Sequence, residues 1–256
     1  MTAQMTIVLL NYRRPGNIPI ILDSIRTQTI RPVVFLWNNG PDDVNFPGVH
    51  RYEKSGRNEG CMVRWKMARE ADTPYVMSLD DDLCFARDDA LADVVLSLRT
   101  MDDPARIVGP AGCCFGEHLS YTKRSDVYAG YAPADRNGQA GRASGDEAVD
   151  MVKGRAMALR RNRLDGLGLP AEREDDIFLS AALAGGRRRF HRVPMRLNGA
   201  FRELPELGVG NWMMPEHLDR RDRAAAEHFR PVLPQPGPAA DHLGNGSCAM
   251  ARSCDG

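Results

Sequence analysis

Short apolar runs alternate with segments of helical periodicity along the first hundred residues. The runs 6–10, 32–37 and 75–79 are rich in β-branched and aromatic residues, which predicts buried strands. Between them, apolar residues recur at three- and four-residue spacing in 18–25 and within 57–71, which predicts two helices. Strands that alternate with helices in this way are typical of α/β proteins with a mostly parallel sheet.

The remaining pattern predicts further elements on both sides of a Gly-rich centre. Asn17 is expected to cap the first helix, and the segment 116–146 is expected to form loops. Other expected elements are a strand near 49–52, a helix from 88 or 89 to about 101, a strand from 107, a strand over 149–161 with a close backbone approach at Gly154, a helix over 174–183 ended by Gly185-Gly186, and a strand over 190–193.

Composition supports one folded domain over residues 1–230. Of the 256 residues, 43% are hydrophobic, which is enough to bury a core. Residues 231–256 are dense in Pro, Gly and small side chains, so we expect a disordered tail. The sequence contains no internal repeat that would indicate a repeat architecture.

Charge and hydropathy exclude several partners. Lys and Arg total 34, as do Asp and Glu, so a neutral chain has no overall field that attracts nucleic acid or an anionic membrane. The apolar N-terminal run 7–10 is far shorter than the roughly 20 residues that span a bilayer. Six cysteines without a C-x-x-C spacing are read as reduced thiols, so we expect a cytoplasmic protein without a membrane span.

Three consecutive aspartates, Asp80, Asp81 and Asp82, follow the predicted strand 75–79. Ligands of open α/β sheets bind at the carboxyl ends of strands, and carboxylates crowded there repel one another unless a cation neutralises them. Oxygen ligands suit Mg²⁺ or Mn²⁺, which commonly take substrate phosphates as their remaining ligands. The alternative is a solvated acidic turn that caps the next helix.

Several other segments share an order and spacing with a known group of enzymes. They are Asn11-Tyr12-Arg13, VVFLWNNG at 33–40, Arg57-Asn58, Asp80-Asp81-Asp82, MVKGRAMALRR at 151–161 and Glu174-Asp175-Asp176-Ile177. With them the sequence, from about Met5 to Phe229, resembles GT-A glycosyltransferases, and more narrowly the exostosin-like and family-2-like nucleotide-sugar transferases. The resemblance implies a Rossmann-like three-layer α/β sandwich with a mostly parallel central sheet. It also implies a nucleotide-sugar and metal half over about 1–115 and an acceptor half over about 116–230.

The resemblance implies a donor site for a nucleotide sugar, with a uridine diphosphate sugar as the expected donor. Asn11, Tyr12 and Arg13 would frame the base, and the Asn39 amide would read the uracil edge unless it is a simple turn residue. Phosphate contacts would come from Arg57, Asn58 and Arg64, of which Arg64 could instead lie on an exposed helix face. Mn²⁺ or Mg²⁺ would be held by Asp82, with Asp80 directly or through water, and with Asp81 beside them.

Asp175 and Asp176 are the candidate catalytic carboxylates. A carboxylate at the acceptor site can take the proton of the attacking hydroxyl, and in a retaining enzyme the same group would hold the acceptor or stabilise charge on the sugar. Successive helix residues point about 100 degrees apart, so one of the two faces the acceptor, and Asp175 is preferred. The alternative is that the acidic run only favours a helix N-terminus.

His217 is a further candidate, since it lies where a loop meets a polar helix. A neutral imidazole there could ligate the metal, and Arg220 could contact phosphate, while an ordinary surface histidine is the alternative. Two other functions fit parts of the pattern. A nucleotidyltransferase shares the α/β layers and acidic site, and a nonenzymatic nucleotide-sugar-binding module would keep the fold without the reaction.

Overall fold

The computed structural model describes residues 3–43, 45–129, 145–170, 174–205 and 216–229. The predicted tail at 231–256, with Cys248 and Cys254, lies outside these residues. The four cysteines in the described part are free thiols. No described helix has the length and apolar content that a bilayer crossing requires.

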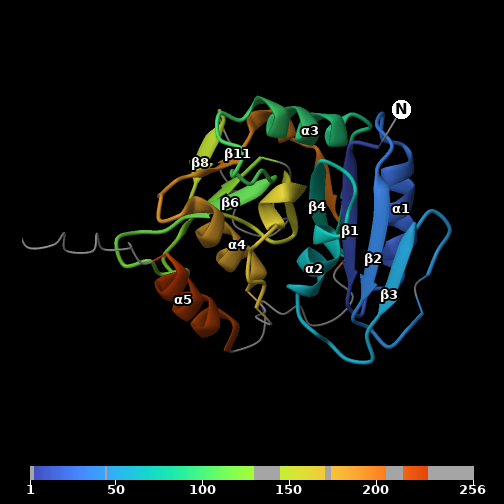
Figure 1. The fold of residues 1–256 in the computed structure, drawn as a ribbon, viewed down its shortest axis with the longest axis horizontal. Coiled ribbons are helices and arrows are strands. Elements are labelled where there is room, and N and C mark those ends of the chain that lie inside the picture. Colours follow the sequence, from blue (N-terminus) through green and yellow to red (C-terminus); the bar gives the residue numbers. More distant parts are fainter. Residues whose placement is uncertain (1–2, 44, 130–144, 171–173, 206–215, 230–256) are drawn as a thin grey trace, which may run out of the picture.

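A five-stranded sheet forms the centre of the molecule, in the order β10-β4-β1-β2-β3 (Figure 1). β1 (Met5–Asn11), β2 (Val33–Asn38), β3 (Arg51–Lys54) and β4 (Tyr75–Asp80) run parallel, and β10 (Ala156–Arg160) pairs antiparallel with β4. Parallel strands bring their carboxyl ends to one edge, so Leu10 is paired with Asp80 and Asn11 with Asn38. The predicted mostly parallel α/β sheet is confirmed.

Helices enclose this sheet. All seven residues of β1 are buried, as expected for a strand covered on both faces. α2 (Val63–Arg69) packs against β1, β2 and β4, whereas α3 (Ala90–Thr100) packs against β10. α1 (Asn17–Arg26) packs against the short strand β5 (Leu83–Phe85), which follows the aspartates.

The second half of the chain builds smaller sheets beside the central one (Figure 1). β6 (Ala111–Cys114) pairs with β7 (Ser125–Tyr128) and β9 (Met151–Val152), β8 (Glu147–Val149) pairs with β11 (His191–Val193), and β12 (Phe201–Glu203) pairs with β5. Two short 3-10 turns lie at Arg161–Leu164 and Met195–Leu197. α4 (Asp175–Ala184) packs against α5 (Glu216–His228). Because β10 comes from this half and joins the central sheet, the two halves share one core.

Asn17 does not cap the first helix as predicted. Gly16 occupies the cap position, and the Asn17 side chain instead donates a hydrogen bond of 2.8 Å to the backbone carbonyl of Asp81. Asn17 is buried, and this contact fixes the loop after β1 against the loop after β4. A long-range polar contact therefore replaced the local one that the sequence suggested.

The strand predicted over 149–161 is interrupted. It divides into the end of β8, β9 and β10, with a turn at 153–155 between the last two. The close approach at Gly154 lies in that turn, where an added Cβ would be 3.0 Å from Nη2 of Arg64. Elsewhere the strand expected from 107 begins later, as β6 at Ala111, and is preceded by isolated bridges at Val108. The predicted loop region 116–146 contains β7, and its residues 130–144 lie outside the described part of the chain.

Candidate functional site

A cavity of about 280 Å³ opens where β1 and β4 end, and α4 and α5 supply its other wall. Twelve of its lining residues are among the sequence-predicted candidates: Tyr12, Arg13, Asn39, Asn58, Arg64, Asp80, Asp81, Asp82, Asp175, Asp176, His217 and Arg220. The fold therefore brings together residues from the two halves of the chain.

Asp81 is held inside the protein. It is 4% exposed, its Oδ1 lies 2.6 Å from Nη1 of Arg14, and its Oδ2 accepts a 2.6 Å hydrogen bond from the backbone N–H of Tyr12. Burial raises the pKa of Asp81 to about 6, against the lowering effects of Arg14 and the Tyr12 amide. These contacts fix the loop after β1 against the aspartate run.

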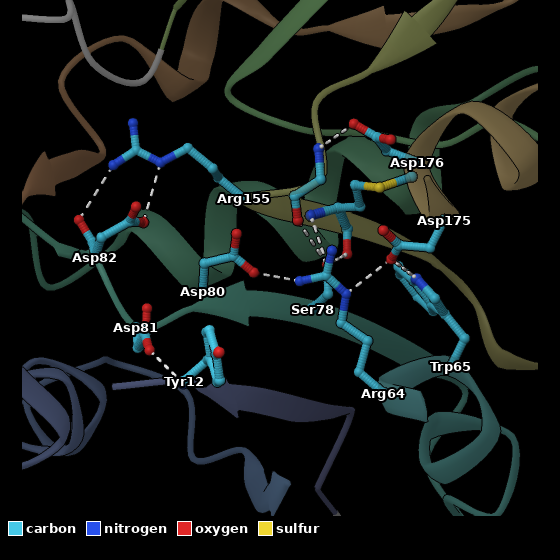
Figure 2. A network of polar contacts seen from close by, with 12 residues as sticks. Tyr12, Arg64, Trp65, Ser78, Asp80, Asp81, Asp82, Arg155, Asp175 and Asp176 are labelled. Atoms are coloured by element: carbon cyan, nitrogen blue, oxygen red, sulfur yellow. Dashed lines mark hydrogen bonds and ion pairs between the residues drawn. The ribbon is translucent and has the colours of Figure 1, made fainter. Parts of the chain in front are cut away.

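Asp80 and Asp82 keep more contact with the cavity, with 27% and 15% of their side chains exposed. Oδ1 of Asp80 accepts from Arg64, and Oδ1 of Asp82 accepts from Nε of Arg155 at 3.0 Å (Figure 2). Burial in the cavity wall, with a further contribution from Asp82, raises the pKa of Asp80 to about 7 despite the opposing Arg64 charge. The second oxygen of each carboxylate accepts no hydrogen bond from the described residues, although Oδ2 of Asp82 forms a longer ion pair with Nη1 of Arg14 at 3.9 Å.

Two oxygen donors at a strand end fit a small divalent cation. Mg²⁺ and similar ions are commonly held by one or two carboxylates, and substrate phosphates and water complete the coordination. In the described part of the chain, no three His, Cys, Asp or Glu side chains converge into a complete cage. A cation held by Asp80 and Asp82 would therefore need substrate oxygens or water to complete its coordination, and among the described residues His217 does not join them as a third ligand.

Arg64 is buried between the two carboxylate groups of the cavity. Its side chain is 1% exposed; Nη1 donates to Asp80, and Nε donates to Oδ2 of Asp175 at 2.9 Å (Figure 2). Trp65 Nε1 donates to the same Asp175 oxygen at 2.5 Å. The exposed helix face considered for Arg64 is thus wrong, because α2 turns this guanidinium into the interior.

Asp175 and Asp176 begin α4 in different environments. Asp175 is 2% exposed, and burial raises its pKa although Arg64 opposes the shift; its Oδ1 accepts no hydrogen bond from described residues. Asp176 is also buried, but the Arg221 guanidinium 2.7 Å away and the Gly154 amide at 3.1 Å lower its pKa in spite of that burial. Asp175 therefore keeps one oxygen, Oδ1, that the described residues leave uncommitted, whereas Asp176 is held as an anion.

α5 contributes a row of side chains to the same wall. Nε of Arg220 lies 2.9 Å from Oε1 of Glu174, and Arg221 is matched by Asp176. Burial and the neighbouring Arg221 and Arg220 charges lower the pKa of His217, whose Nδ1 has no hydrogen-bond partner within the described ranges. Burial and the neighbouring arginines thus disfavour the imidazolium form of His217, which lies beside the acidic end of α4.

The residues predicted to bind the base differ in whether their side chains can contact a ligand in the cavity. Asn39 is 4% exposed; its Oδ1 accepts from Nε1 of Trp37 at 3.0 Å, and its Nδ2 donates to the carbonyl of Gly60 at 2.9 Å. Both ends of the amide thus serve the protein itself. Tyr12 and Arg13 line the cavity, with the Arg13 guanidinium 4.8 Å from the centre of the Tyr12 ring.

Asn11 and Arg57 lie outside the cavity lining. The Asn11 side chain is buried and donates to Oδ1 of Asn38 at 2.7 Å, so it braces β1 against β2. Arg57 is 85% exposed, and its Nε lies 3.7 Å from Glu59. Asn58, in contrast, lines the cavity and accepts a 2.9 Å hydrogen bond from the Gly60 amide.

Six lining residues with charged or hydroxyl-bearing side chains were not among these twelve candidates: Arg14, Tyr121, Lys153, Arg155, Glu174 and Arg221. Lys153 and Arg155 flank Gly154, whose expected close approach was a signal for a wall of the site. Arg221 follows His217 by four residues and so shares its helix face. Arg221 is buried and pairs with Asp176, whereas its neighbour Arg220 is more exposed and pairs with Glu174.

No family profile and no curated protein matches the sequence. Among solved structures, the chain is similar to the mannosyltransferase PcManGT from Pyrobaculum calidifontis in complex with GDP-Man and Mn²⁺, with 18% identity and a TM-score of 0.55 over 88% of this chain and 70% of that chain. It is also similar to residues 1–349 of TarS from S. aureus, with 11% identity and a TM-score of 0.53 over 74% of this chain and 57% of that chain. At such identities a structural match establishes the fold alone. The strand order and these similarities show that the chain has the glycosyltransferase A (GT-A) fold.

Proposed function

We propose that the protein is a metal-dependent glycosyltransferase, which moves a sugar from a nucleoside diphosphate sugar to a hydroxyl or amine acceptor. One observation carries the proposal. Asp80 and Asp82 at the end of β4 and Asp175 at the start of α4 line the same cavity, and the buried Arg64 contacts Asp80 on one side and Asp175 on the other. A carboxylate pair that can hold a metal, next to a carboxylate that can act as a base, is suited to transfer from a diphosphate donor.

The donor end of the cavity is the part lined by Asp80 and Asp82. A Mg²⁺ or Mn²⁺ ion bound there would offset the charge that grows on the leaving diphosphate. Arg155 contacts Asp82 through Oδ1, and Oδ2, which lies 3.9 Å from Nη1 of Arg14, would be the oxygen that holds the cation. In the Pyrobaculum mannosyltransferase structure the bound nucleotide sugar is GDP-Man, with Mn²⁺. The resemblance of 33–40 to base-binding segments implies uridine, but both ends of the Asn39 amide in that segment are engaged within the protein. UDP- and GDP-sugars are therefore the two donors to compare first.

Asp175 is the proposed general base. Arg64 and Trp65 hold its Oδ2, which leaves Oδ1 to accept the proton of the acceptor hydroxyl. Its pKa is raised by burial, and a base with a raised pKa takes up a proton more readily at neutral pH. Asp176 has both oxygens engaged, by Gly154, Arg221 and its own helix, so its proposed role is to fix that wall.

Ligand-induced stabilisation tests the donor proposal. Melting temperatures would be measured with UDP-, GDP-, CMP- and dTDP-sugars, each with and without Mn²⁺, because a ligand that binds only the folded state raises the melting temperature. We expect a Mn²⁺-dependent increase with one nucleotide that Asp82→Asn abolishes. Asp72→Asn, at an exposed aspartate away from the cavity, is the matched control.

The other two functions predict different outcomes. A nucleotidyltransferase would release pyrophosphate from a nucleoside triphosphate and sugar phosphate. A binding module would show the melting-temperature increase but would cleave no donor. A protein that responds to none of the nucleotides, with or without the metal, contradicts the proposal.

A further inference from the structure

Lys153 lies in the cavity wall, in the turn between β9 and β10. Its side chain is 13% exposed. The ammonium Nζ lies 2.8 Å from Oδ2 of Asp126 and 2.6 Å from the hydroxyl of Tyr128. A lysine ammonium has three N–H donors, so these contacts anchor it and leave one donor uncommitted among the described residues. The mechanism above makes no use of this group.

The wall around Lys153 carries more positive than negative charge. Asp126 is shared by two cations, because Nε of Arg124 lies 2.7 Å from its other oxygen, Oδ1. Within the described ranges, no second carboxylate forms an ion pair with Lys153 or Arg124. The two neighbouring arginines on α5 are each matched, Arg221 by Asp176 and Arg220 by Glu174. Among these described side chains, one positive charge is therefore left without a counter-charge at this wall.

Aromatic rings compensate only part of that excess. The Lys153 ammonium lies 4.4 Å from the centre of the Tyr128 ring, and the Tyr121 ring contacts the guanidinium of Arg124 at 3.8 Å. Such contacts contribute less than a paired carboxylate. Burial lowers the pKa of Lys153 to about 8 although Asp126 opposes the shift, so keeping the ammonium charged here costs free energy. An anion bound beside it would remove that cost.

The position of Lys153 relates it to the acceptor side. The next residue, Gly154, donates its amide to Asp176, on the helix turn that also carries the proposed base. Asp80 and Asp82, the donor-side carboxylates, pair instead with Arg64 and Arg155. A group bound at Lys153 thus lies on the α4 side of the cavity.

We propose that Lys153 forms an anion subsite, and that the acceptor of this enzyme carries a carboxylate or phosphate group which binds there. The assignment of the bound anion to the acceptor rests on the proposed function, whereas the anion subsite itself does not. Its chemistry predicts that neutral acceptors are used poorly and that their anionic counterparts are used well.

Binding of inorganic phosphate and of acetate tests the subsite without a known acceptor. The full chain would be titrated with each anion by calorimetry at constant ionic strength, with and without the nucleotide diphosphate and Mn²⁺. We expect Lys153→Met to weaken binding roughly tenfold, the loss of one charge-assisted hydrogen bond. Lys66→Met, at an exposed lysine of α2, should bind as the wild type does. Preference for phosphate or acetate distinguishes the two anion classes.

Two stability readouts separate an anion subsite from a purely structural lysine. Lys153→Met leaves Arg124 and Asp126 as a neutral pair, so its melting temperature should equal or exceed that of the wild type. Asp126→Asn removes the shared carboxylate and should tighten anion binding while it destabilises the fold. A Lys153→Met protein that unfolds more easily but binds anions normally would overturn the proposal.

Acceptor pairs that differ in one charged group complete the test. Glucose would be compared with glucose 6-phosphate and glucuronate, and glycerol with glycerol 3-phosphate, as acceptors or as inhibitors of donor hydrolysis. We expect the anionic member of a pair to act at lower concentration, and Lys153→Met to remove the difference. Anion binding that is displaced by the nucleotide would assign Lys153 to the donor and contradict the inference. Absence of any nucleotide response, with anion binding intact, would instead contradict the proposed function.

Discussion

Arg64 and Asp175 form an ion pair in which Nε of the arginine lies 2.9 Å from Oδ2 of the aspartate, and both side chains are almost completely buried. The two residues are 111 positions apart in the sequence. Because Arg64 also donates to Asp80, this one guanidinium joins the end of the central sheet to the start of α4. The proposed metal side and the proposed base are thus held by the same group.

Arg64→Gln should destabilise the protein by about 3 kcal/mol or more, since it leaves two buried carboxylates without their cation. Urea unfolding at neutral pH measures the effect. Arg26→Gln is the control, because Arg26 forms an exposed ion pair with Asp23 on the surface of α1 and should cost less than about 1 kcal/mol. Equal losses for the two variants would mean that the buried pair contributes no more than a surface one.

Asp175→Asn and Asp176→Asn should fail in different ways. Loss of the base should lower kcat by roughly a hundredfold or more with little change in nucleotide affinity. Loss of the Asp176 charge leaves Arg221 unpaired at 7% exposure, so that variant should mainly lose stability. Steady-state kinetics and urea unfolding on both proteins make the comparison. Wild-type turnover in Asp175→Asn would mean that another group acts as the general base.

His191 should make the protein less stable as the pH falls below neutral. It is fully buried, and burial lowers its pKa to about 4 in the folded state, although the Ser180 carbonyl opposes the shift. The unfolded chain, with a pKa near the usual value of about 6.5, then binds the proton first, so stability is present above that pH and is lost toward pH 4.

Protonation of His191 should lower the free energy of unfolding by about 2 kcal/mol between pH 7 and pH 5. Urea unfolding of the wild type and of His191→Gln at the two pH values isolates it from the other titrating groups. His118→Gln, at an exposed histidine, should keep the wild-type pH dependence. The same pH dependence in His191→Gln would show that the buried imidazole is not its source.

The central sheet and the position of the aspartates were predictable because they depend on local pattern. β1 and β4 are nearly continuous apolar runs, and a strand that is buried on both faces has few alternatives in such a segment. The polar residues that end these strands must then meet at one edge of a parallel sheet. That reasoning placed Asp80 and Asp82 in the cavity without any knowledge of their partners.

The partners themselves could not be predicted, because they depend on long-range packing. Periodicity assigned Arg64 to a helix but gave no reason to bury it, since its counter-charge at Asp175 comes from a distant segment. The Asn17 side chain, expected to cap the first helix, instead donates a hydrogen bond to the Asp81 carbonyl. Arg221 lies in a helix so rich in charge that its sequence indicates a solvated face, yet it is buried against Asp176.

The most direct test of the central claim is the product formed from a nucleoside diphosphate sugar that the protein binds. The wild type with Mn²⁺ should slowly release the nucleoside diphosphate and free sugar in the absence of an acceptor, and Asp82→Asn should release neither, while Asp72→Asn behaves as the wild type. Chromatography of the reaction mixture resolves the products. Release at the same rate by Asp82→Asn, or no cleavage of any bound nucleotide sugar by the wild type, would contradict the claim that this cavity transfers sugar.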